Sequence, residues 1–183
     1  MTVPWQPVFA TLFENCRGFV ELRALPSERR AFFAPTETDA ITGFLAQHPA
    51  QDLYFGVATR RDRSSGRLEN CCHLGALYVD LDFKTLPEAD ARERLRRFQF
   101  EPTIVVHSGG GLHVYWALRE PIDLPQAADY ARQLLRRLAC ALGADLNAAE
   151  PARVLRVPGT HNRKPEYGAP RLVRVEHLNA HAL

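Results

Sequence analysis

ALYVDLDF, residues 76–83, has the clearest periodic pattern in the chain. Its apolar residues alternate with Tyr78, Asp80 and Asp82, which predicts a β-strand with one apolar face and one acidic face. Residues two apart on a strand share a face, with Cα atoms about 6–7 Å apart, so the two carboxylates can hold divalent cations between them. Oxygen ligands of this kind suit Mg²⁺ or Mn²⁺. The alternative is a pair of solvent-facing aspartates, although unpaired carboxylates in so apolar a strand are costly.

A helix and a hairpin are expected after this strand. Residues 85–98, TLPEADARERLRRF, predict the helix, because Thr85 and Glu88 have the spacing of a capping box. The apolar stripe expected on this helix consists of Leu86, Ala89 and the residues from Leu95 to Phe98. Residues 102–108, PTIVVHS, predict a buried strand, the glycines after it predict a turn, and residues 112–118, LHVYWAL, predict its antiparallel partner.

The remaining C-terminal sequence completes an α+β plan. Apolar residues at helical spacing follow Pro125, and Gly143 stands where that helix should stop. A closing strand can come from RVLRV at 153–157 or from RLVRV at 171–175. The order from residue 76 onward is therefore βαββαβ, the ferredoxin-like plan, in which the first and third strands lie side by side.

The N-terminal part of the sequence predicts a smaller αβ layer added to this unit. GFVELRAL at 18–25 and DLYFGVAT at 52–59 are typical of strands, and Thr38 to Gln47 is typical of a helix. A chain of 183 residues is long enough for one well-packed domain. We therefore expect a single domain, 1–183, that combines an αβ layer at 1–75 with a palm-like unit at 76–183.

A glycine-rich turn is the second candidate site feature. In HSGGGLHVYW, residues 107–116, the three glycines are more than a hairpin turn needs, and they let backbone N–H groups approach an anion. Ser108 adds a hydroxyl and His113 a ring donor, so the functional interpretation is a phosphate-binding turn. The alternative is a flexible hairpin with a buried histidine. His113 and Tyr115 share one face of their strand, and catalysis requires that face to adjoin the aspartates.

A third candidate segment begins at Asp145, just past the second expected helix. An expected fourth strand flanking the first would let the Asp145 carboxylate reach the metal site, and Glu150 is the rival for that role. Positive charges suited to a triphosphate or a template backbone follow at Arg153, Arg156 and Lys164. Arginines in such a segment are equally typical of surface salt bridges.

Bulk composition excludes a disordered or membrane-embedded chain. Hydrophobic residues make up 46% and charged residues 24%, and no apolar run is long enough to span a membrane. The N-terminus lacks the basic start and unbroken apolar stretch of a secretory signal, so we expect a cytoplasmic protein without a membrane partner. A net charge of +2 is too small to indicate nucleic-acid binding by itself. The four cysteines, which lack zinc-site spacing, are expected as reduced thiols, and the alternative is a metal role for Cys71, Cys72 and His73.

Taken together, the three motifs resemble those of the archaeo-eukaryotic primase superfamily, and most closely its plasmid, phage and CRISPR-associated, RepB-like primase-polymerase branch. The matching residues are Asp80-Leu-Asp82, then Ser108-Gly-Gly-Gly-Leu-His113, then Asp145 followed by Arg153-Val-Leu-Arg156 and Pro158-Gly-Thr-His-Asn-Arg-Lys164. YFGVATR at 54–60 also resembles the region upstream of the first motif. The resemblance implies an RRM-like palm that uses two Mg²⁺ or Mn²⁺ ions to join a nucleotide to a 3′-hydroxyl on a DNA template.

The same resemblance implies roles for individual residues. The implied metal ligands, which are also the catalytic residues, are Asp80, Asp82 and Asp145. The implied nucleotide-binding residues are Ser108, Gly109, Gly110, Gly111, His113, Arg153, Arg156, Asn162 and Lys164. One departure is that Gly111, and not a serine, stands two residues before His113, so Ser108 fills the serine's role only through a longer turn.

The implied partners are a single-stranded DNA template and primer, nucleoside triphosphates, and a helicase or C-terminal initiation module outside this chain. Because no initiating module is evident, we expect the chain to extend primers better than it starts them. Three other classes share parts of the pattern. A template-independent nucleotidyltransferase or cyclase needs the metals but no DNA, a non-catalytic replication module binds DNA without metals, and a metal-dependent nuclease needs the paired carboxylates but not the glycine turn.

Overall fold

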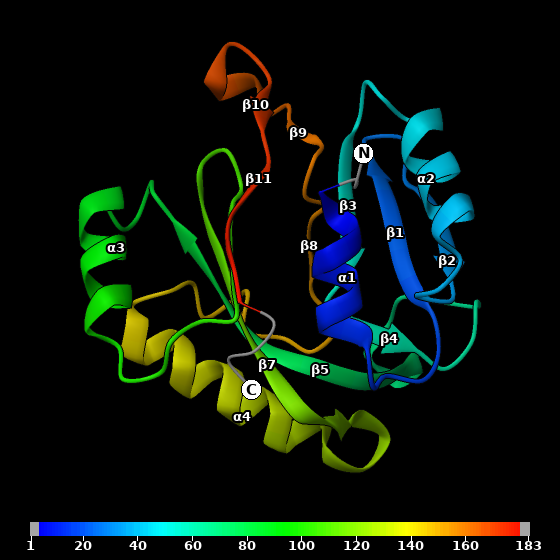
Figure 1. The fold of residues 1–183 in the computed structure, drawn as a ribbon, viewed down its shortest axis with the longest axis horizontal. Coiled ribbons are helices and arrows are strands. Elements are labelled where there is room, and N and C mark those ends of the chain that lie inside the picture. The colour runs from blue at the N-terminus through cyan, green and yellow to red at the C-terminus, as the bar shows by residue number, and fades with distance from the viewer. Residues whose placement is uncertain (1–3, 180–183) are drawn as a thin grey trace.

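The computed structural model describes residues 4–179, which form two antiparallel sheets, a short two-stranded ribbon and four α-helices (Figure 1). The larger sheet has the spatial order β11 (Arg174–Leu178), β6 (Ile104–His107), β7 (Gly111–Asp123), β5 (Cys71–Asp82) and β4 (Ala58–Arg60). The smaller sheet has the order β2 (Arg29–Phe33), β1 (Val20–Leu25), β3 (Asp52–Gly56) and β8 (Val154–Arg156). The ribbon pairs β10 (Arg171–Leu172) with β9 (His161–Asn162).

The helices are α1 (Trp5–Phe13), α2 (Thr38–Gln47), α3 (Glu88–Arg97) and α4 (Leu124–Leu142), and the short 3₁₀ turns are η1 (Leu68–Asn70) and η2 (Pro165–Tyr167). In the described part of the chain, none of these helices combines the length and the apolar character that crossing a bilayer requires. The predicted helix at 38–47 is confirmed. The predicted end of α4 at Gly143 is also confirmed, because Gly143 has a left-handed φ of +70°, which is typical of a residue that ends a helix.

The long strand β5 is formed by the alternating stretch that the sequence singled out. It pairs with β7 over most of its length, so the first and third strands of the palm are neighbours, as predicted. Its apolar residues, with those of β6 and β7, pack under α3 and α4. This cluster consists of Val79, Leu81, Leu86, Ala91, Val105, Leu112, Val114 and Leu142. The opposite face of β5 therefore presents Tyr78, Asp80 and Asp82.

The start of α3 differs from the sequence prediction. The helix begins after Pro87 with no side-chain cap, and the Thr85 hydroxyl donates to the Asp82 carbonyl instead of capping. The capping-box prediction was wrong, because Pro87 lacks an N–H and starts the helix two residues later than Thr85 would. As a result Ala89 is exposed, and Ala91 takes its expected place in the core.

The α+β fold class with an RRM-like palm is confirmed, but the strand next to β5 is not the expected one. That neighbour is β4, from the N-terminal part of the chain. RVLRV forms β8 in the other sheet, where Leu155 pairs with Phe55, and β11 closes the palm sheet at its far edge beside β6. A strand of three residues has too short an apolar pattern to specify which sheet edge it joins, so burial of Leu155 against Phe55 decides.

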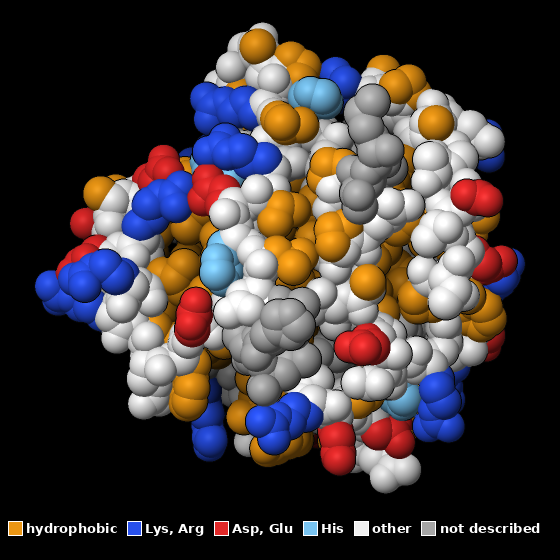
Figure 2. All heavy atoms as spheres, viewed as in Figure 1, with side chains coloured by type: hydrophobic (Ala, Val, Ile, Leu, Met, Phe, Trp, Pro, Cys, Tyr) orange, Lys and Arg blue, Asp and Glu red, His pale blue; other side chains and the backbone are white. Residues whose placement is uncertain are grey.

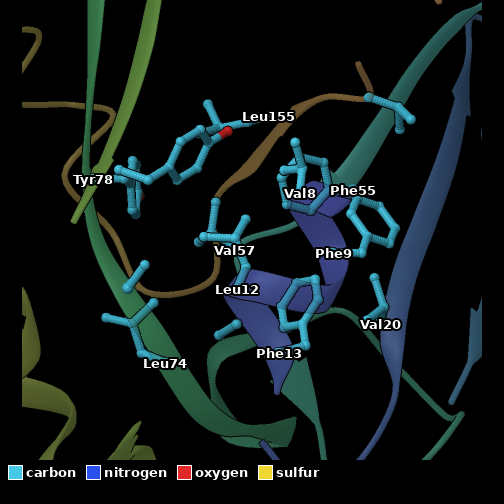
Figure 3. Packing of buried hydrophobic residues seen from close by; sticks show 14 of the residues in the cluster. Val8, Phe9, Leu12, Phe13, Val20, Phe55, Val57, Leu74, Tyr78 and Leu155 are labelled. Atoms are coloured by element: carbon cyan, nitrogen blue, oxygen red, sulfur yellow. The ribbon is translucent and has the colours of Figure 1, made fainter. Parts of the chain in front are cut away.

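The N-terminal layer contains both predicted strands, together with α1 and β2, which the sequence prediction missed. The buried side chains of α1 form a helical apolar stripe that consists of Trp5, Val8, Phe9, Leu12 and Phe13. Figure 3 shows Val8, Phe9, Leu12 and Phe13 of this stripe between the two sheets. The ring centroid of Phe9 lies 4.8 Å from that of Phe55 on β3. One continuous core therefore joins the two sheets and fixes their relative position.

The arginine cluster on α3 is a solvated, ion-paired helix face. Arg92 contacts Glu88 at 2.7 Å and Glu176 at 2.9 Å, while Arg96 contacts Glu93 at 2.8 Å. Basic and acidic side chains are accordingly interspersed over α3 (Figure 2). Within the described residues, this cluster does not form a uniform basic stripe.

Candidate active site

The acidic face of β5 opens into a pocket of about 230 Å³ between the two sheets. The strand register places Asp80 opposite His113 and Asp82 opposite Gly111 on β7, so the histidine face does adjoin the aspartates. His113 Nε2 lies 3.7 Å from Asp80 Oδ1. The pocket is lined by Tyr54, Asp80, Asp82, Ser108, Gly110, Gly111, His113, Arg153, Val154, Leu155, Arg156, Asn162, Lys164 and Tyr167.

The glycine turn forms one end of this pocket. Gly109 has a φ of +88°, a conformation that favours glycine, and its N–H donates to His107 Nδ1 at 3.1 Å. The Ser108 N–H donates to the Gly111 carbonyl at 2.9 Å. Two N–H groups of the turn are thus used internally. Gly110 and Gly111 are the two glycines of the turn that line the pocket, so the phosphate-binding turn stays a prediction.

A basic wall faces the acidic strand across the pocket. Arg156 is 5% exposed, forms an ion pair with Asp52, and lies 4.7 Å above the ring centroid of Tyr54. Asn162 Nδ2 donates to the Ser108 carbonyl at 2.9 Å, and this hydrogen bond ties the β9 segment to the glycine turn. Of the nine predicted nucleotide-binding residues, eight line the pocket, and the ninth, Gly109, does not.

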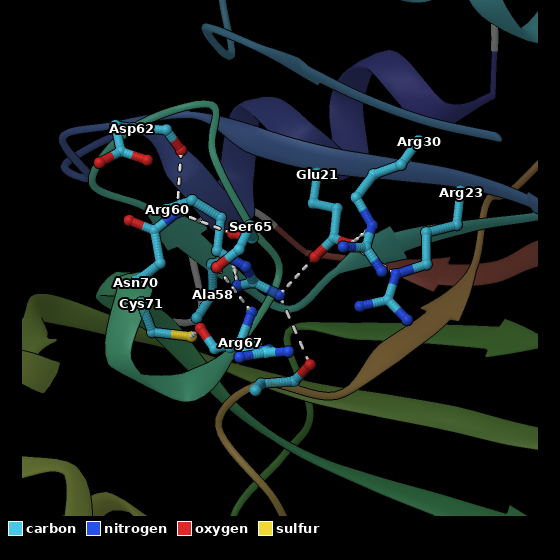
Figure 4. Close-up of polar contacts among 11 residues, drawn as sticks. Glu21, Arg23, Arg30, Ala58, Arg60, Asp62, Ser65, Arg67, Asn70 and Cys71 are labelled. Carbon is cyan, nitrogen blue, oxygen red and sulfur yellow. Dashed lines mark hydrogen bonds and ion pairs between the residues drawn. The ribbon is translucent and has the colours of Figure 1, made fainter. Parts of the chain in front are cut away.

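A buried charge cluster supports the chain just before this basic wall (Figure 4). Arg60 and Glu21 are both fully buried and contact each other at 2.7 Å. Arg60 also donates to the carbonyls of Ala58 at 2.6 Å and Ala152 at 3.4 Å, while Glu21 contacts Arg30 at 2.9 Å. Arg60 therefore positions the main chain next to Arg153. The sequence prediction missed this cluster, although an acidic residue inside the apolar GFVELRAL strand was a usable signal.

Burial and neighbouring charges set the protonation of the pocket histidine. Burial lowers the pKa of His113, Asp80 raises it, and Arg156 and Arg153 lower it further. His113 is therefore neutral near pH 7, and its Nδ1 has no hydrogen-bond partner among residues 4–179. Burial also raises the pKa of Tyr115 on the same strand face well above its usual value, so its hydroxyl stays protonated.

Asp145 approaches Asp80 through its main chain. Its N–H donates to the Asp80 carbonyl at 3.4 Å, while its carboxylate accepts the Asn147 N–H at 2.8 Å and does not line the pocket. The Glu150 carboxylate lies 3.9 Å from Arg132, also outside the pocket. Within residues 4–179, no group of three or more His, Cys, Asp or Glu side chains is arranged to hold a metal. The pocket brings together two of the three predicted acids.

The cysteines are all free thiols in the structure. His73, the partner considered for Cys71 and Cys72, accepts the Arg17 N–H at its Nδ1 at 3.0 Å. Burial raises the pKa of both Cys71 and Cys72, which disfavours the thiolate that a metal would require.

Two pocket residues, Tyr54 and Tyr167, and one residue that holds the pocket residue Arg156, Asp52, were not singled out by the sequence. Tyr54 is the first residue of YFGVATR, and the resemblance of this stretch to the region upstream of the first motif could have indicated it. Asp52 accepts both the Arg156 guanidinium and the Arg163 N–H at 2.8 Å, a role that depends on two later segments of the chain. Tyr167 reaches the pocket from the loop before β10, and nothing in its local sequence predicts that position.

Comparisons with known proteins agree with this fold. A family model described as the RepB DNA-primase N-terminal domain matches residues 23–182. The primase-polymerase AEP domain of cyanophage S-2L is similar over 96% of this chain and 90% of its own, with a TM-score of 0.66 and 16% identity. The catalytic domain of the primase RepB′, solved with initiator DNA, is similar over 97% and 86%, with a TM-score of 0.64 and 18% identity.

A third solved structure, the polymerase domain of Mycobacterium tuberculosis ligase D in complex with DNA, covers 94% of this chain and 78% of its own, with a TM-score of 0.54 and 14% identity. No curated protein sequence matches the chain significantly. At such low identity, the structural likeness establishes the fold, and the family match covers most of the chain.

Proposed function

Because the chain belongs to the RepB DNA-primase N-terminal domain family, within the archaeo-eukaryotic primase superfamily, we propose that it is a template-directed nucleotidyltransferase. Its substrates would be a nucleoside triphosphate and a primer 3′-hydroxyl on single-stranded DNA. The hydroxyl oxygen attacks the α-phosphorus, the bond from that phosphorus to the pyrophosphate oxygen breaks, and the hydroxyl proton leaves to solvent. Pyrophosphate is the second product.

The observation that supports this proposal is the shared pocket. Asp80 and Asp82 lie on one wall, and Arg153, Arg156 and Lys164 lie on the other, with the glycine turn at one end. Carboxylates opposite guanidinium and ammonium groups suit a substrate whose triphosphate carries several negative charges. Salt bridges would have paired all three of these basic side chains, whereas among residues 4–179 only Arg156 of the three has an ion-pair partner, Asp52.

The acidic wall fits divalent cations by its donor chemistry. Asp80 and Asp82 offer oxygen ligands on one strand face, as Mg²⁺ and Mn²⁺ prefer. Bound ions would lower the pKa of the attacking hydroxyl and stabilise charge on the reacting phosphate. We retain Asp145 as the third ligand in this proposal. The hydrogen bond from its main-chain N–H to the Asp80 carbonyl supports this role, because it keeps the two residues close together.

The basic wall would hold and orient the nucleotide. Arg153 and Lys164 can contact phosphate oxygens, and the neutral His113 can donate a hydrogen bond to one of them. A phosphate near His113 would raise its pKa, since an opposite charge favours the protonated ring. Burial of the pocket between the two sheets strengthens each of these interactions.

Primer extension tests this proposal. The full chain, Mn²⁺ or Mg²⁺, a primed DNA template and nucleotides should yield extended primer. Asp80→Ala and Asp82→Ala should each reduce incorporation by about 10³-fold or more without loss of fold, because ion binding contributes several kcal/mol to transition-state stabilisation. Asp129→Ala, an acid with an 88% exposed side chain on α4, is the matched control and should retain activity.

The outcomes separate the competing classes. Extension by Asp80→Ala at the wild-type rate contradicts the proposal. Equal incorporation without template would identify a template-independent transferase, and shortening of the primer would identify a nuclease. DNA binding that is unaffected by metal, with no incorporation, would identify a non-catalytic module.

A further inference from the structure

The three glycines of the turn are required for three different reasons. Gly109 has a positive φ, and a Cβ on Gly111 would lie 2.2 Å from the Leu81 carbonyl oxygen of the neighbouring strand. Gly110 has neither constraint. A Cβ there would instead lie 1.9 Å from the hydroxyl oxygen and 2.7 Å from the ring carbon Cζ of Tyr167. The middle glycine therefore makes room for a side chain that comes from a distant part of the sequence.

Tyr167 is held over this turn by contacts on two sides. The Arg171 guanidinium lies 4.0 Å above the Tyr167 ring centroid and donates to the Gly109 carbonyl at 2.9 Å. On the other side, Glu166 contacts Lys84 at 2.5 Å, just beyond the end of β5. The segment from η2 to β10 accordingly lies at the same end of the molecule as the β6–β7 turn (Figure 1). These contacts place the tyrosine on the pocket wall.

The hydroxyl of Tyr167 is available to a ligand. It makes no hydrogen bond to any residue within 4–179, and the side chain lines the pocket together with Gly110 and Lys164. A phenol beside an ammonium group suits an anionic oxygen acceptor. Gly111 lies opposite Asp82 in the strand register, and the Gly110 carbonyl accepts the Phe83 N–H, so the tyrosine enters the pocket at the end that Asp82 borders.

We propose that Tyr167 binds a phosphate group of the incoming nucleotide's triphosphate through its hydroxyl, and that Gly110 is glycine to admit it. This inference rests on the proposed function for the identity of the natural ligand. The site itself would bind a polyphosphate, with one phenol hydroxyl among its hydrogen-bond donors. Inorganic tripolyphosphate is therefore a direct probe, because it carries the phosphates without the sugar, base or reaction.

Tyr167→Phe removes the hydroxyl and keeps the ring against Arg171. The KM for nucleotide and the Kd for tripolyphosphate, measured by calorimetry, should each rise about tenfold, because a hydrogen bond to a charged group is lost. The kcat should stay unchanged. Tyr130→Phe, at an exposed position on α4, is the matched control and should alter neither constant.

Gly110→Ala tests the same contact from the other side. The added methyl should displace Tyr167 and raise the tripolyphosphate Kd about as much as Tyr167→Phe does. Combining the two changes should add little to either alone, because both remove one interaction. Gly43→Ala, with no heavy atom within 4 Å of the new Cβ, controls for the substitution itself.

Polyphosphate binding through Tyr167 and primer extension are separate properties, and each can be lost without the other. An unchanged tripolyphosphate Kd in Tyr167→Phe overturns the inference even if primers are extended normally. So does a Gly110→Ala chain that loses stability but keeps the wild-type Kd. A tyrosine-dependent Kd in a chain that never extends primers supports the polyphosphate site and overturns only the polymerase proposal.

Discussion

The two walls of the pocket are built in different ways. The acidic wall lies on β5 and β7, strands of 12 and 13 residues that pair along most of their length. The basic wall lies on β8 and β9, strands of three and two residues, and on the loops around them. The first wall is positioned by its own backbone register. The second is positioned by groups from elsewhere in the chain, among them the side chains of Asp52 and Arg60 and the main-chain carbonyl of Ser108.

This difference predicts that the basic wall is the more vulnerable to changes outside the pocket. A residue on β5 keeps its place as long as the sheet forms. A residue near Arg153 keeps its place only while the buried ion pair between Arg60 and Glu21 is intact. Substitutions far from any substrate should therefore affect the basic wall first.

The largest effect is expected for Arg60→Met. It leaves Glu21 buried without its fully buried partner and releases the Ala152 carbonyl, so the free energy of unfolding should fall by about 3–5 kcal/mol. Urea unfolding measures this change. Arg63→Met breaks an exposed pair with Glu37 and should cost at most about 1 kcal/mol. Equal costs for the two variants would show that the buried cluster does not support the wall.

A smaller effect, on catalysis alone, should decide the third acid. Asp145→Asn should lower kcat for primer extension about 100-fold, because it weakens ion binding at the acidic wall. Glu150→Gln should stay within about twofold of wild type, since its carboxylate lies beside Arg132. The reverse ranking in steady-state kinetics would assign the ligand role to Glu150.

The smallest effect is expected in the pH dependence of stability, through His113. The pKa of His113 is lowered from its usual value of 6.5, so below pH 6.5 the unfolded chain binds more protons than the folded chain. Its contribution to stability is present above that pH and is lost as pH falls. His73 and His107, whose pKa values are also lowered by burial, act in the same direction.

His113→Gln should therefore reduce the loss of unfolding free energy between pH 6.5 and pH 5 by about 1 kcal/mol, measured by urea titrations at each pH. At pH 8 both chains should show no pH dependence from this residue. An identical slope in the two proteins would contradict the neutral histidine.

Much of the acidic wall was determined by the sequence alone. Strict alternation in ALYVDLDF fixes which side chains share a face, and the glycine turn followed by LHVYWAL fixes a hairpin. Helical apolar spacing likewise located α2 and α4. These features depend on local periodicity, which a single stretch of chain contains in full.

Tertiary structure alone decided the rest. Three features depend on residues distant in sequence. These are the pairing of RVLRV with β3 and not with β5, the need for a glycine at position 110, and the direction of the Asp145 carboxylate. Short strands and loops have too little periodicity to specify their neighbours, so burial and charge pairing across the fold make that choice. The ligand roles of Asp80, Asp82 and Asp145 stay a prediction from sequence, and the structure adds the pocket in which to test it.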